Sequence, residues 1–277
     1  MNFTTKLRKS AEKNNSIVCL GMDPVIEKIP FEEKNNGKKI IKFYGDIIEA
    51  VAGNVSAVKP NYAFFAQYGF PGLRALKKVI GISRKKKLPV ILDAKRGDIG
   101  KSSEAYAREV FDFWKADAVT VSPYMGTDSV EPFISRCSSG KGVYVLVRTS
   151  NTGASDLQEI ISTNGKKMLI KVAEKVVEWH KDGVGAVVGA TNPEELKNIS
   201  EFFSSAKKSV PLLIPGVGSQ GGSAKEVAAI LKNIGDIKIH RINSSSGINY
   251  AYKKNETNDY AGAAARAVKE LNEEITL

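Results

Sequence analysis

The sequence predicts a (β/α)₈ barrel, the TIM-barrel architecture of the α/β class, and two observations predict it. Eight short apolar runs rich in β-branched residues recur along the 277 residues, and stretches of helical periodicity separate them. Strands that alternate with helices pair in parallel through right-handed crossovers, and continuous apolar strands indicate a sheet covered on both faces. The number of runs and the chain length favour one barrel domain formed by residues 1–277, with a doubly wound sheet as the alternative.

The predicted strands are spread along the whole chain. They are SIVCLGMD (16–23), VSAVKP (55–60), LPVILDAK (88–95), DAVTVSP (117–123), GVYVLVR (142–148), GVGAVVGA (183–190), VPLLIPG (210–216) and IKIHRIN (237–243). Helix signals lie between them. Apolar side chains recur on one helical face in residues 38–51. Ser223 is a predicted N-cap, and Thr191 or Asn192 caps a helix whose first turn holds Pro193.

Composition and charge narrow the classes of protein. The chain has 41 basic and 30 acidic residues, a formal net charge of +11, but its lysines are spread over many short runs without interleaved aromatic residues. This pattern is typical of a solvated surface that attracts an anionic small molecule, and it argues against a nucleic-acid-binding protein. Cys19 and Cys137 are predicted to be buried hydrophobes rather than a disulfide or a nucleophile. No segment has a signal-peptide or transmembrane pattern, so we expect a cytosolic protein without a membrane partner.

In such a barrel the chemistry belongs to the carboxyl ends of the strands. Charged side chains end several apolar runs: Asp23 the first, Lys59 the second, and Asp93 and Lys95 the third. One charged strand end is usually a solvated loop residue, but three that converge on one rim indicate a functional site. Lys95, with the carboxylates of Asp93 and Asp98 nearby, is favoured as a fixed ammonium and proton donor over the neutral amine that a Schiff base needs.

A glycine-rich motif follows the seventh predicted strand. Gly216, Gly218 and Gly221 match G-x-G-x-x-G, which is also a dinucleotide fingerprint, but the next strand ends in NSSSG and offers no acid for a ribose. The loops after strands seven and eight of a barrel usually bind phosphate, through backbone N–H groups and a helix N-terminus. Neither histidine lies at ligand spacing from a rim carboxylate, so we expect no metal. Residues 150–166, the longest gap between elements, are a predicted flap.

Together these motifs resemble one family. LDAKRGDIG (92–100) resembles the D-x-K-x-x-D signature of the orotidine 5′-phosphate decarboxylases, in particular the branch with the D-A-K-R-G-D-I motif. The resemblance covers nearly the whole barrel. The other segments that look like this family are CLGMDP, VKPNYAFF, VTVSPYMGTDSV, VRTSNTGASDLQ, VVGATNPEEL and PGVGSQGG. The resemblance implies decarboxylation of orotidine 5′-monophosphate to uridine 5′-monophosphate in pyrimidine synthesis, without a metal or organic cofactor.

The resemblance also implies roles for individual residues. Lys95 is similar to the lysine that protonates C6 of the pyrimidine as carbon dioxide leaves, and Asp93 to the carboxylate beside the substrate's own. Lys59 resembles the lysine that links this array to the ribose, and Asp23 the aspartate that binds a ribose hydroxyl. Asp98 resembles the aspartate that reaches the neighbouring subunit's site, which implies a homodimer with shared active sites. The other implied substrate contacts are Ile99, Ser102, Ser150, Pro215, Gly218, Gln220, Ser246 and Gly247.

One position departs from the family pattern. After strand eight the family has N-S-S-R-G-I, with an arginine that binds the phosphate, whereas this chain has Ser246 there. Arg241 lies about 17 Å away along an extended strand, toward the other end of the barrel, and does not substitute. The chain is expected either to use a lysine from elsewhere or to be a weakened nucleotide-binding variant.

The other alternative is a magnesium-dependent sugar-phosphate decarboxylase or aldolase on the same barrel. That enzyme would share the D-x-K-x-x-D pattern. Ser150, which resembles the serine that reads the pyrimidine ring, and Gln220, which resembles the glutamine that bridges phosphate and base, favour the pyrimidine enzyme.

Overall fold

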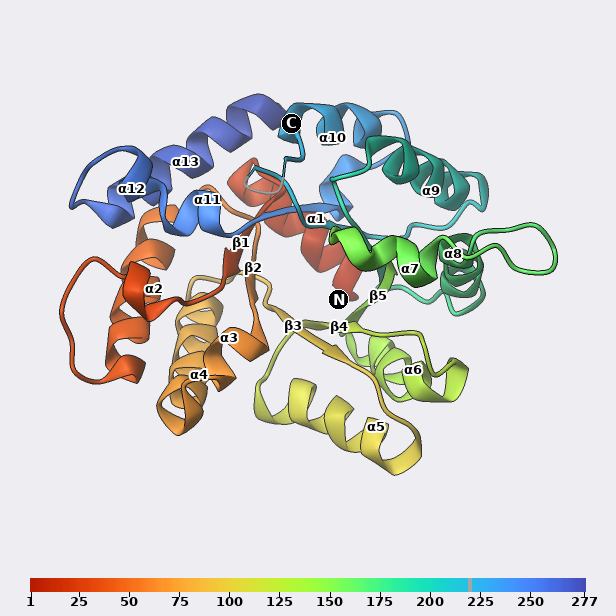
Figure 1. The fold of residues 1–277 in the computed structure, drawn as a ribbon, viewed down its shortest axis with the longest axis horizontal. Coiled ribbons are helices and arrows are strands. Elements are labelled where there is room, and N and C mark those ends of the chain that lie inside the picture. The colour runs from red at the N-terminus through yellow and green to blue at the C-terminus, as the bar shows by residue number, and fades with distance from the viewer. Residues whose placement is uncertain (219–220) are drawn as a thin grey trace.

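The computed structural model describes residues 1–218 and 221–277, and these form an eight-stranded barrel with helices outside it (Figure 1). The strands are β1 (Val18–Met22), β2 (Ala57–Pro60), β3 (Ile91–Arg96), β4 (Ala118–Val121), β5 (Gly142–Arg148), β6 (Val184–Val188), β7 (Leu212–Ile214) and β8 (Arg241–Ser244). The sheet order is β2-β1-β8-β7-β6-β5-β4-β3, and every pairing is parallel. Bridges from Val58 to Val90 and from Asn61 to Asp93 join β2 to β3. The predicted barrel is therefore confirmed, and the doubly wound sheet is excluded.

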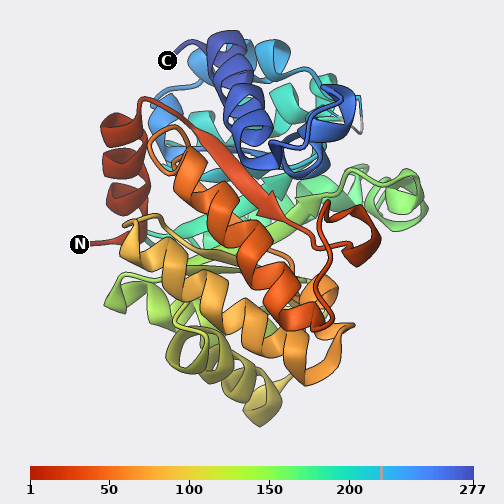
Figure 2. The same ribbon diagram turned by 90° about the vertical axis from the view of Figure 1, so that its left-hand side faces the viewer.

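Helices surround the strands. The longer ones are α1 (Phe3–Asn14), α2 (Asn36–Val51), α4 (Gly69–Lys85), α5 (Gly100–Arg108), α6 (Thr127–Ile134), α8 (Met168–Glu178), α9 (Pro193–Ser205), α10 (Ala224–Lys232) and α13 (Tyr260–Ile275). Short helical turns are α3 (Tyr62–Ala66), α7 (Ser155–Gln158), α11 (Ser246–Asn249), α12 (Ala251–Lys254), η1 (Ile26–Lys28), η2 (Glu109–Phe113), η3 (Ser135–Ser139), η4 (Thr152–Ala154) and η5 (Ile237–Ile239). Figure 2 shows α2 lying along the outside of the barrel, where it packs between α4 and α13.

Capping side chains fix where two of these helices begin. The Ser223 hydroxyl accepts the N–H of Glu226 at 3.3 Å at the start of α10. Asn192, rather than Thr191, caps α9 by accepting the N–H of Glu195 at 3.1 Å. Both predicted helix starts are confirmed, because each side chain satisfies a backbone donor that the first helical turn leaves unpaired.

Alternate residues of the strands face two different apolar clusters. The larger cluster lies between the strands and the helices and includes Val18, Leu20 and Met22 of β1. The smaller one holds one side chain from each of β1 to β7 together with two from α1. Its members are Phe3, Leu7, Cys19, Ala57, Ile91, Ala118, Tyr144, Val187 and Leu213. Because successive strand residues point to opposite faces, the smaller cluster is the filling of the barrel. Both cysteines are buried free thiols, as predicted.

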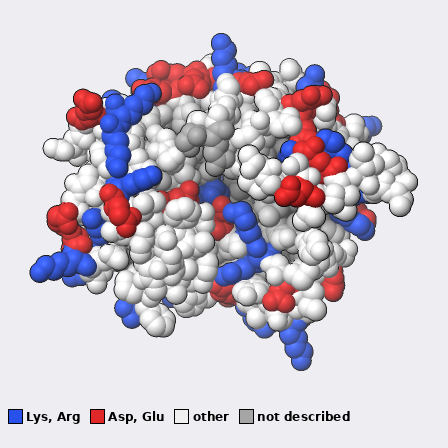
Figure 3. Space-filling view, viewed as in Figure 1, with Lys and Arg blue, Asp and Glu red and all other residues white. Residues whose placement is uncertain are grey.

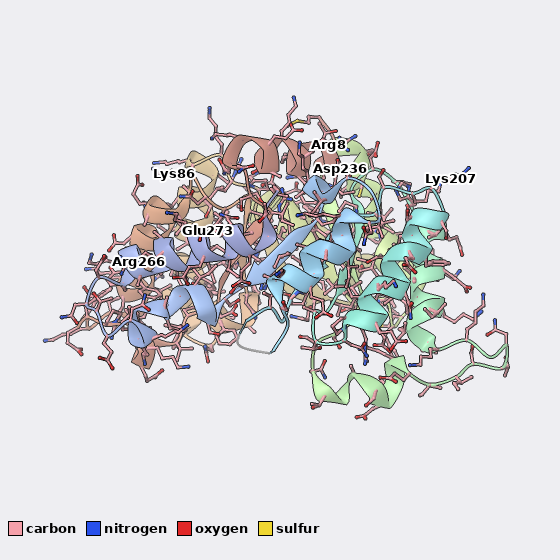
Figure 4. The ribbon with its side chains drawn as sticks, turned by 90° about the horizontal axis from the view of Figure 1, so that it is seen from above. Arg8, Lys86, Lys207, Asp236, Arg266 and Glu273 are labelled. Atoms are coloured by element: carbon pink, nitrogen blue, oxygen red, sulfur yellow. The ribbon has the colours of Figure 1, made fainter. Side chains whose placement is uncertain are left out.

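Helix α1 closes the amino-terminal end of the barrel. Phe3 packs edge-to-face on Tyr144, with ring centroids 6.0 Å apart. It sits so close to β5 that a Cβ at Gly142 would lie 2.2 Å from its ring, so only glycine fits there. Arg8 of α1 forms an ion pair of 2.5 Å with Asp236, beside η5 (Figure 4). This end of the barrel, called the closed end below, is thus sealed by packing and by charge.

Arg241 is wholly buried at the closed end. Its Nη1 donates to the carbonyl oxygens of Lys238 at 3.0 Å and His240 at 2.6 Å, and its Nη2 donates to the carbonyl of Leu7 at 2.6 Å. Burial lowers the pKa of Arg241 to about 10. The guanidinium lies away from the carboxyl ends of the strands, as its position in the sequence predicted.

The eighth strand begins later than predicted. Residues 237–239 were expected as strand but form η5, because the Asp236 carboxylate accepts the N–H of Lys238 at 3.0 Å and starts a turn there. The strand itself runs from Arg241. Residues 150–166, the predicted flap, contain η4 and α7. No described helix is both long and apolar enough to span a bilayer.

Candidate active site

A cavity of about 530 Å³ opens at the carboxyl ends of the strands, opposite α1. Figure 3 shows basic and acidic atoms meeting in the hollow at the centre of this face. The cavity brings together seven of the residues predicted for the site. They are Asp23, Lys59, Asp93, Lys95, Ser150, Pro215 and Ser246. Residues from the ends of six strands or the loops after them therefore meet at one place.

Asp93 lies between two ammonium groups at the floor of this cavity. Its Oδ2 is 2.7 Å from Lys59 Nζ, and its Oδ1 is 2.8 Å from Lys95 Nζ. The side chains of Lys59 and Asp93 are buried, whereas that of Lys95 is 51% exposed. The outer lysine is therefore the one that a bound molecule can reach.

Electrostatics keep the buried pair ionised. Burial by itself disfavours both charges, but each is opposed by its partner. The lysines hold the pKa of Asp93 far below its usual range, and the carboxylates of Asp93 and Asp23 raise the pKa of Lys59 above its ordinary value. With Lys95 charged, the three side chains carry a net charge of +1 and are preorganised for an anion or for negative charge that develops during a reaction.

A bend in β3 sets the position of Lys95. The pairing of β3 with β4 is irregular at this point, and Lys95 has a φ of 44°, in the left-handed region. Thr120 of β4 holds the bend, because its Oγ1 accepts the N–H groups of Ala94 at 3.1 Å and Lys95 at 2.9 Å. The same hydroxyl donates to Asp93 Oδ1 at 3.0 Å. Strand alternation predicts that Asp93 and Lys95 point the same way; in the structure a bend, rather than regular alternation, brings them together.

Asp23 lies in the wall of the cavity at the end of β1. Its Oδ1 is buried and has no hydrogen-bond partner among the described residues. The neighbouring backbone is fixed by Tyr250, whose Oη donates to the carbonyl of Asp23 at 3.0 Å and accepts the N–H of Val25 at 3.1 Å. A held carboxylate with an unpaired acceptor suits a ligand hydroxyl.

The segment after β5 forms another wall. Residues 149–151 line the cavity, and the Gln158 amide holds their start by accepting the N–H of Thr149 at 3.0 Å and donating to its Oγ1 at 2.8 Å. Arg148, the charged end of β5, is not part of the lining. It pairs with Glu159 at 2.7 Å and so anchors the predicted flap to the strand.

Five predicted site residues lie outside the lining in the single chain. They are Asp98, Ile99, Ser102, Gly218 and Gly247. Asp98 Oδ1 accepts the N–H of Ile99 at 2.8 Å, and the Ile99 side chain is 56% exposed. Gly218 has a φ of 83° in the glycine-rich loop, whose residues 215–217 do line the cavity. Gln220 lies outside the described residues.

Several lining residues were not predicted from the sequence. They include Lys28, Asn61, Thr120, Asn243 and Tyr250. A threonine or asparagine inside an apolar strand run, such as Thr120 or Asn243, gives no functional signal. Asn61 did offer a functional signal, since it lies two residues after Lys59, the charged end of a strand. Among residues 1–218 and 221–277, no three histidine, cysteine, aspartate or glutamate side chains group as metal ligands.

Comparisons with known proteins point to one family. The model of the orotidine 5′-phosphate decarboxylase / HUMPS family matches residues 16–258. An orotidine 5′-phosphate decarboxylase of Herpetosiphon aurantiacus is 41% identical over 253 residues, covering 90% of this chain and 92% of that protein. The structure of Leishmania donovani OMP decarboxylase is 32% identical, with a TM-score of 0.80 and 100% of both chains covered.

Leishmania donovani UMP synthase is a longer structural relative. It is 34% identical, with a TM-score of 0.80 over 98% of this chain, which spans 56% of that protein's length. A family model that covers most of the barrel, and a relative that is 41% identical over nearly the full length, both lead to one assignment. The chain belongs to the orotidine 5′-phosphate decarboxylase / HUMPS family.

Proposed function

We propose that this chain decarboxylates orotidine 5′-monophosphate to uridine 5′-monophosphate, a carbon–carbon lyase reaction of pyrimidine synthesis. The observation that carries the proposal is the Lys59–Asp93–Lys95 array at the cavity floor, with Asp93 within 2.8 Å of both ammonium groups. The Herpetosiphon relative bears the name of this activity. The magnesium-dependent sugar-phosphate enzyme that the D-x-K-x-x-D pattern also allows is the competing activity, and the experiment below separates the two.

The charges of the array fit the chemistry of this reaction. When the bond between C6 and the carboxylate breaks, carbon dioxide leaves and the electron pair stays on C6, where the ring does not delocalise it. An ammonium already in place stabilises that charge more in the transition state than in the ground state. Lys95, the exposed lysine of the array, then gives its Nζ proton to C6 and recovers a proton from water.

The rest of the cavity would orient the substrate. Asp93 holds both ammonium groups, and Asp23 accepts from a ribose hydroxyl through its unpaired Oδ1. Ser150 contacts the pyrimidine, and the loop of Pro215 together with the Ser246 segment faces the phosphate. Binding of the remote phosphate supplies energy to orient the base over Lys95.

A spectrophotometric assay with EDTA tests the proposal. Wild-type protein should remove the absorbance of orotidine 5′-monophosphate at the same rate with and without EDTA. A Lys95→Ala sample prepared in the same way is the control for a contaminating decarboxylase. Unchanged absorbance with folded wild-type protein would refute the proposal. Loss of the activity in EDTA would instead favour the magnesium-dependent class.

We further infer a homodimer in which each site uses Asp98 of the other subunit. In one chain Asp98 lies outside the cavity, beside the exposed Ile99, on the loop that follows β3. Mixing inactive Lys95→Ala with inactive Asp98→Ala chains should restore activity, because one site of each hybrid dimer receives both native residues. Random exchange gives about a quarter of the wild-type activity. Verified subunit exchange without any recovery would contradict the shared site.

We place the enzyme in the cytosol and assign it no nucleic-acid or membrane partner. Two buried free thiols, Cys19 and Cys137, suit a reducing compartment. The excess of 11 positive charges would serve to attract an anionic substrate.

A further inference from the structure

We propose that Lys28 binds the phosphate of the nucleotide, supplying the positive charge that the family pattern places at position 246. The proposal rests on the proposed function, because it assumes a phosphorylated nucleotide in the cavity. It assigns a binding role to a residue of the loop after β1, whereas Ser246 follows β8, near the other end of the sequence.

Lys28 is the cavity cation that is not committed to a carboxylate. The lysines in the described lining are Lys28, Lys59 and Lys95, and no arginine is among them. Lys59 and Lys95 both pair with Asp93. Lys28 forms no ion pair within the described part of the chain; its Nζ lies 5.4 Å from the ring centroid of Tyr250. An exposed contact with a ring is weak and leaves the ammonium donors available to an anion.

Hydrogen bonds tie the loop of Lys28 to the segment that follows β8. Tyr252 Oη donates to the carbonyl of Lys28 at 2.6 Å. Tyr250 Oη bonds the backbone of Asp23 and Val25, while the N–H of Tyr250 donates to the carbonyl of Ser246 at 3.0 Å. Lys28 is therefore anchored to the same short stretch of chain in which the family pattern N-S-S-R-G-I has its arginine.

The chemistry of lysine suits this role. The ammonium is a point charge on a flexible stem, so it can leave the face of Tyr250 and meet a phosphate oxygen. Lysine binds phosphate as a point charge rather than through the two-pronged contact of arginine. Since Lys59 and Lys95 are held at the floor by Asp93, the lysine at the rim is left for the far end of the nucleotide.

Binding of uridine 5′-monophosphate and of uridine tests the proposal. Lys28→Met keeps much of the apolar stem and removes the charge; Lys253→Ala removes an equal charge from exposed α12, outside the cavity lining. Lys28→Met should weaken binding of the nucleotide about tenfold and leave that of uridine unchanged. Lys253→Ala should change neither affinity by more than about twofold. Thermal melts verify that both variants are folded.

A second substitution separates phosphate binding from a disturbed loop. Ser246→Arg introduced into the Lys28→Met protein should restore the nucleotide affinity, because a guanidinium then supplies the charge directly, and should leave uridine binding unchanged. Unchanged nucleotide affinity in Lys28→Met, or equal losses for nucleotide and nucleoside, would overturn the proposal. Those results leave the proposed function intact if wild-type protein consumes orotidine 5′-monophosphate. Wild-type protein that neither binds the nucleotide nor turns over the substrate would refute the function itself.

Discussion

The two ends of the barrel each bury a cation, and the two cations have partners of different kinds. At the carboxyl ends of the strands Lys59 lies 2.7 Å from the carboxylate of Asp93. At the closed end Arg241 donates to three backbone carbonyls, and no described carboxylate pairs with it. Burial disfavours both cations. Nearby carboxylates outweigh burial and raise the pKa of Lys59, whereas burial prevails and lowers the pKa of Arg241 to about 10.

The difference separates a cation that serves folding from one that serves chemistry. Carbonyl dipoles at the closed end are fixed by the fold, and they enclose the Arg241 guanidinium, whose Nε has no partner among the described residues. The carboxylate of Asp93 is a full charge that Lys59 shares with Lys95, so the array keeps an exposed ammonium facing the cavity. Substitutions at the cavity should therefore lower turnover more than stability, and substitutions at the closed end should do the reverse.

Lys95→Ala should have the largest effect. Loss of the proton donor and of the charge at the developing carbanion should lower kcat at least about 10³-fold. Because Lys95 is half-exposed, the midpoint of urea unfolding should change little. Steady-state kinetics and urea melts of the same sample check both halves, and a variant that keeps a tenth of the wild-type kcat would remove Lys95 from its role.

Arg241→Met should give the opposite result. It removes the donor from three carbonyl oxygens, two of them in buried contacts, so the free energy of unfolding should fall by about 3 kcal/mol. The kcat per folded molecule should stay within about twofold of wild type. Arg8→Ala, which breaks the exposed pair with Asp236 at the same end, is the matched control and should cost less than about 1 kcal/mol. Equal losses in the two variants would show that Arg241 contributes no more than a surface charge.

His240 should make the closed end sensitive to acid. Burial lowers the pKa of His240 from 6.5 to about 3, so between these pH values the unfolded chain binds a proton that the folded chain does not. Stability therefore falls as the pH drops through this window, by about 2 kcal/mol between pH 7 and pH 5.

His240→Asn tests this pH dependence. The asparagine oxygen can still accept the N–H of Leu212, which His240 Nδ1 accepts at 3.0 Å. Urea unfolding at pH 7 and pH 5 should show a difference about 2 kcal/mol smaller in the variant than in wild type. The same pH dependence in both proteins would mean that other groups cause the acid sensitivity.

Thr120→Val should give the smallest effect, again at the cavity. The valine removes the hydroxyl that holds Asp93 and the bend at Lys95, so kcat should fall about tenfold with KM nearly unchanged. Thr120→Ser keeps the hydroxyl and should retain most of the wild-type kcat. A parallel loss in both variants would point to packing of the methyl group instead.

The barrel could be predicted because its apolar strands and helix signals recur along the chain. The features that could not be predicted depend on contacts of individual side chains. Apolar strands and capping residues such as Ser223 act through near neighbours, so they can be read from the sequence. The start of β8 could not be, because the side chain of Asp236 turned an apolar run into η5. Within the site, charged strand ends such as Lys59 and Asp93 were visible. Thr120 looked like an ordinary strand residue, because its hydroxyl acquires its hydrogen-bond partners only through the bend of β3.

The contact of Arg241 with the Leu7 carbonyl has a consequence for synthesis of the protein. Its two partners are 234 positions apart in the chain, so a ribosome needs roughly 10 to 50 seconds to travel from one to the other. During that interval α1 lacks its guanidinium, and β1 lacks the neighbour on its β8 side. Helix α1 thus waits for β8, the last described strand, and this end of the barrel stays unsealed while most of the barrel is translated.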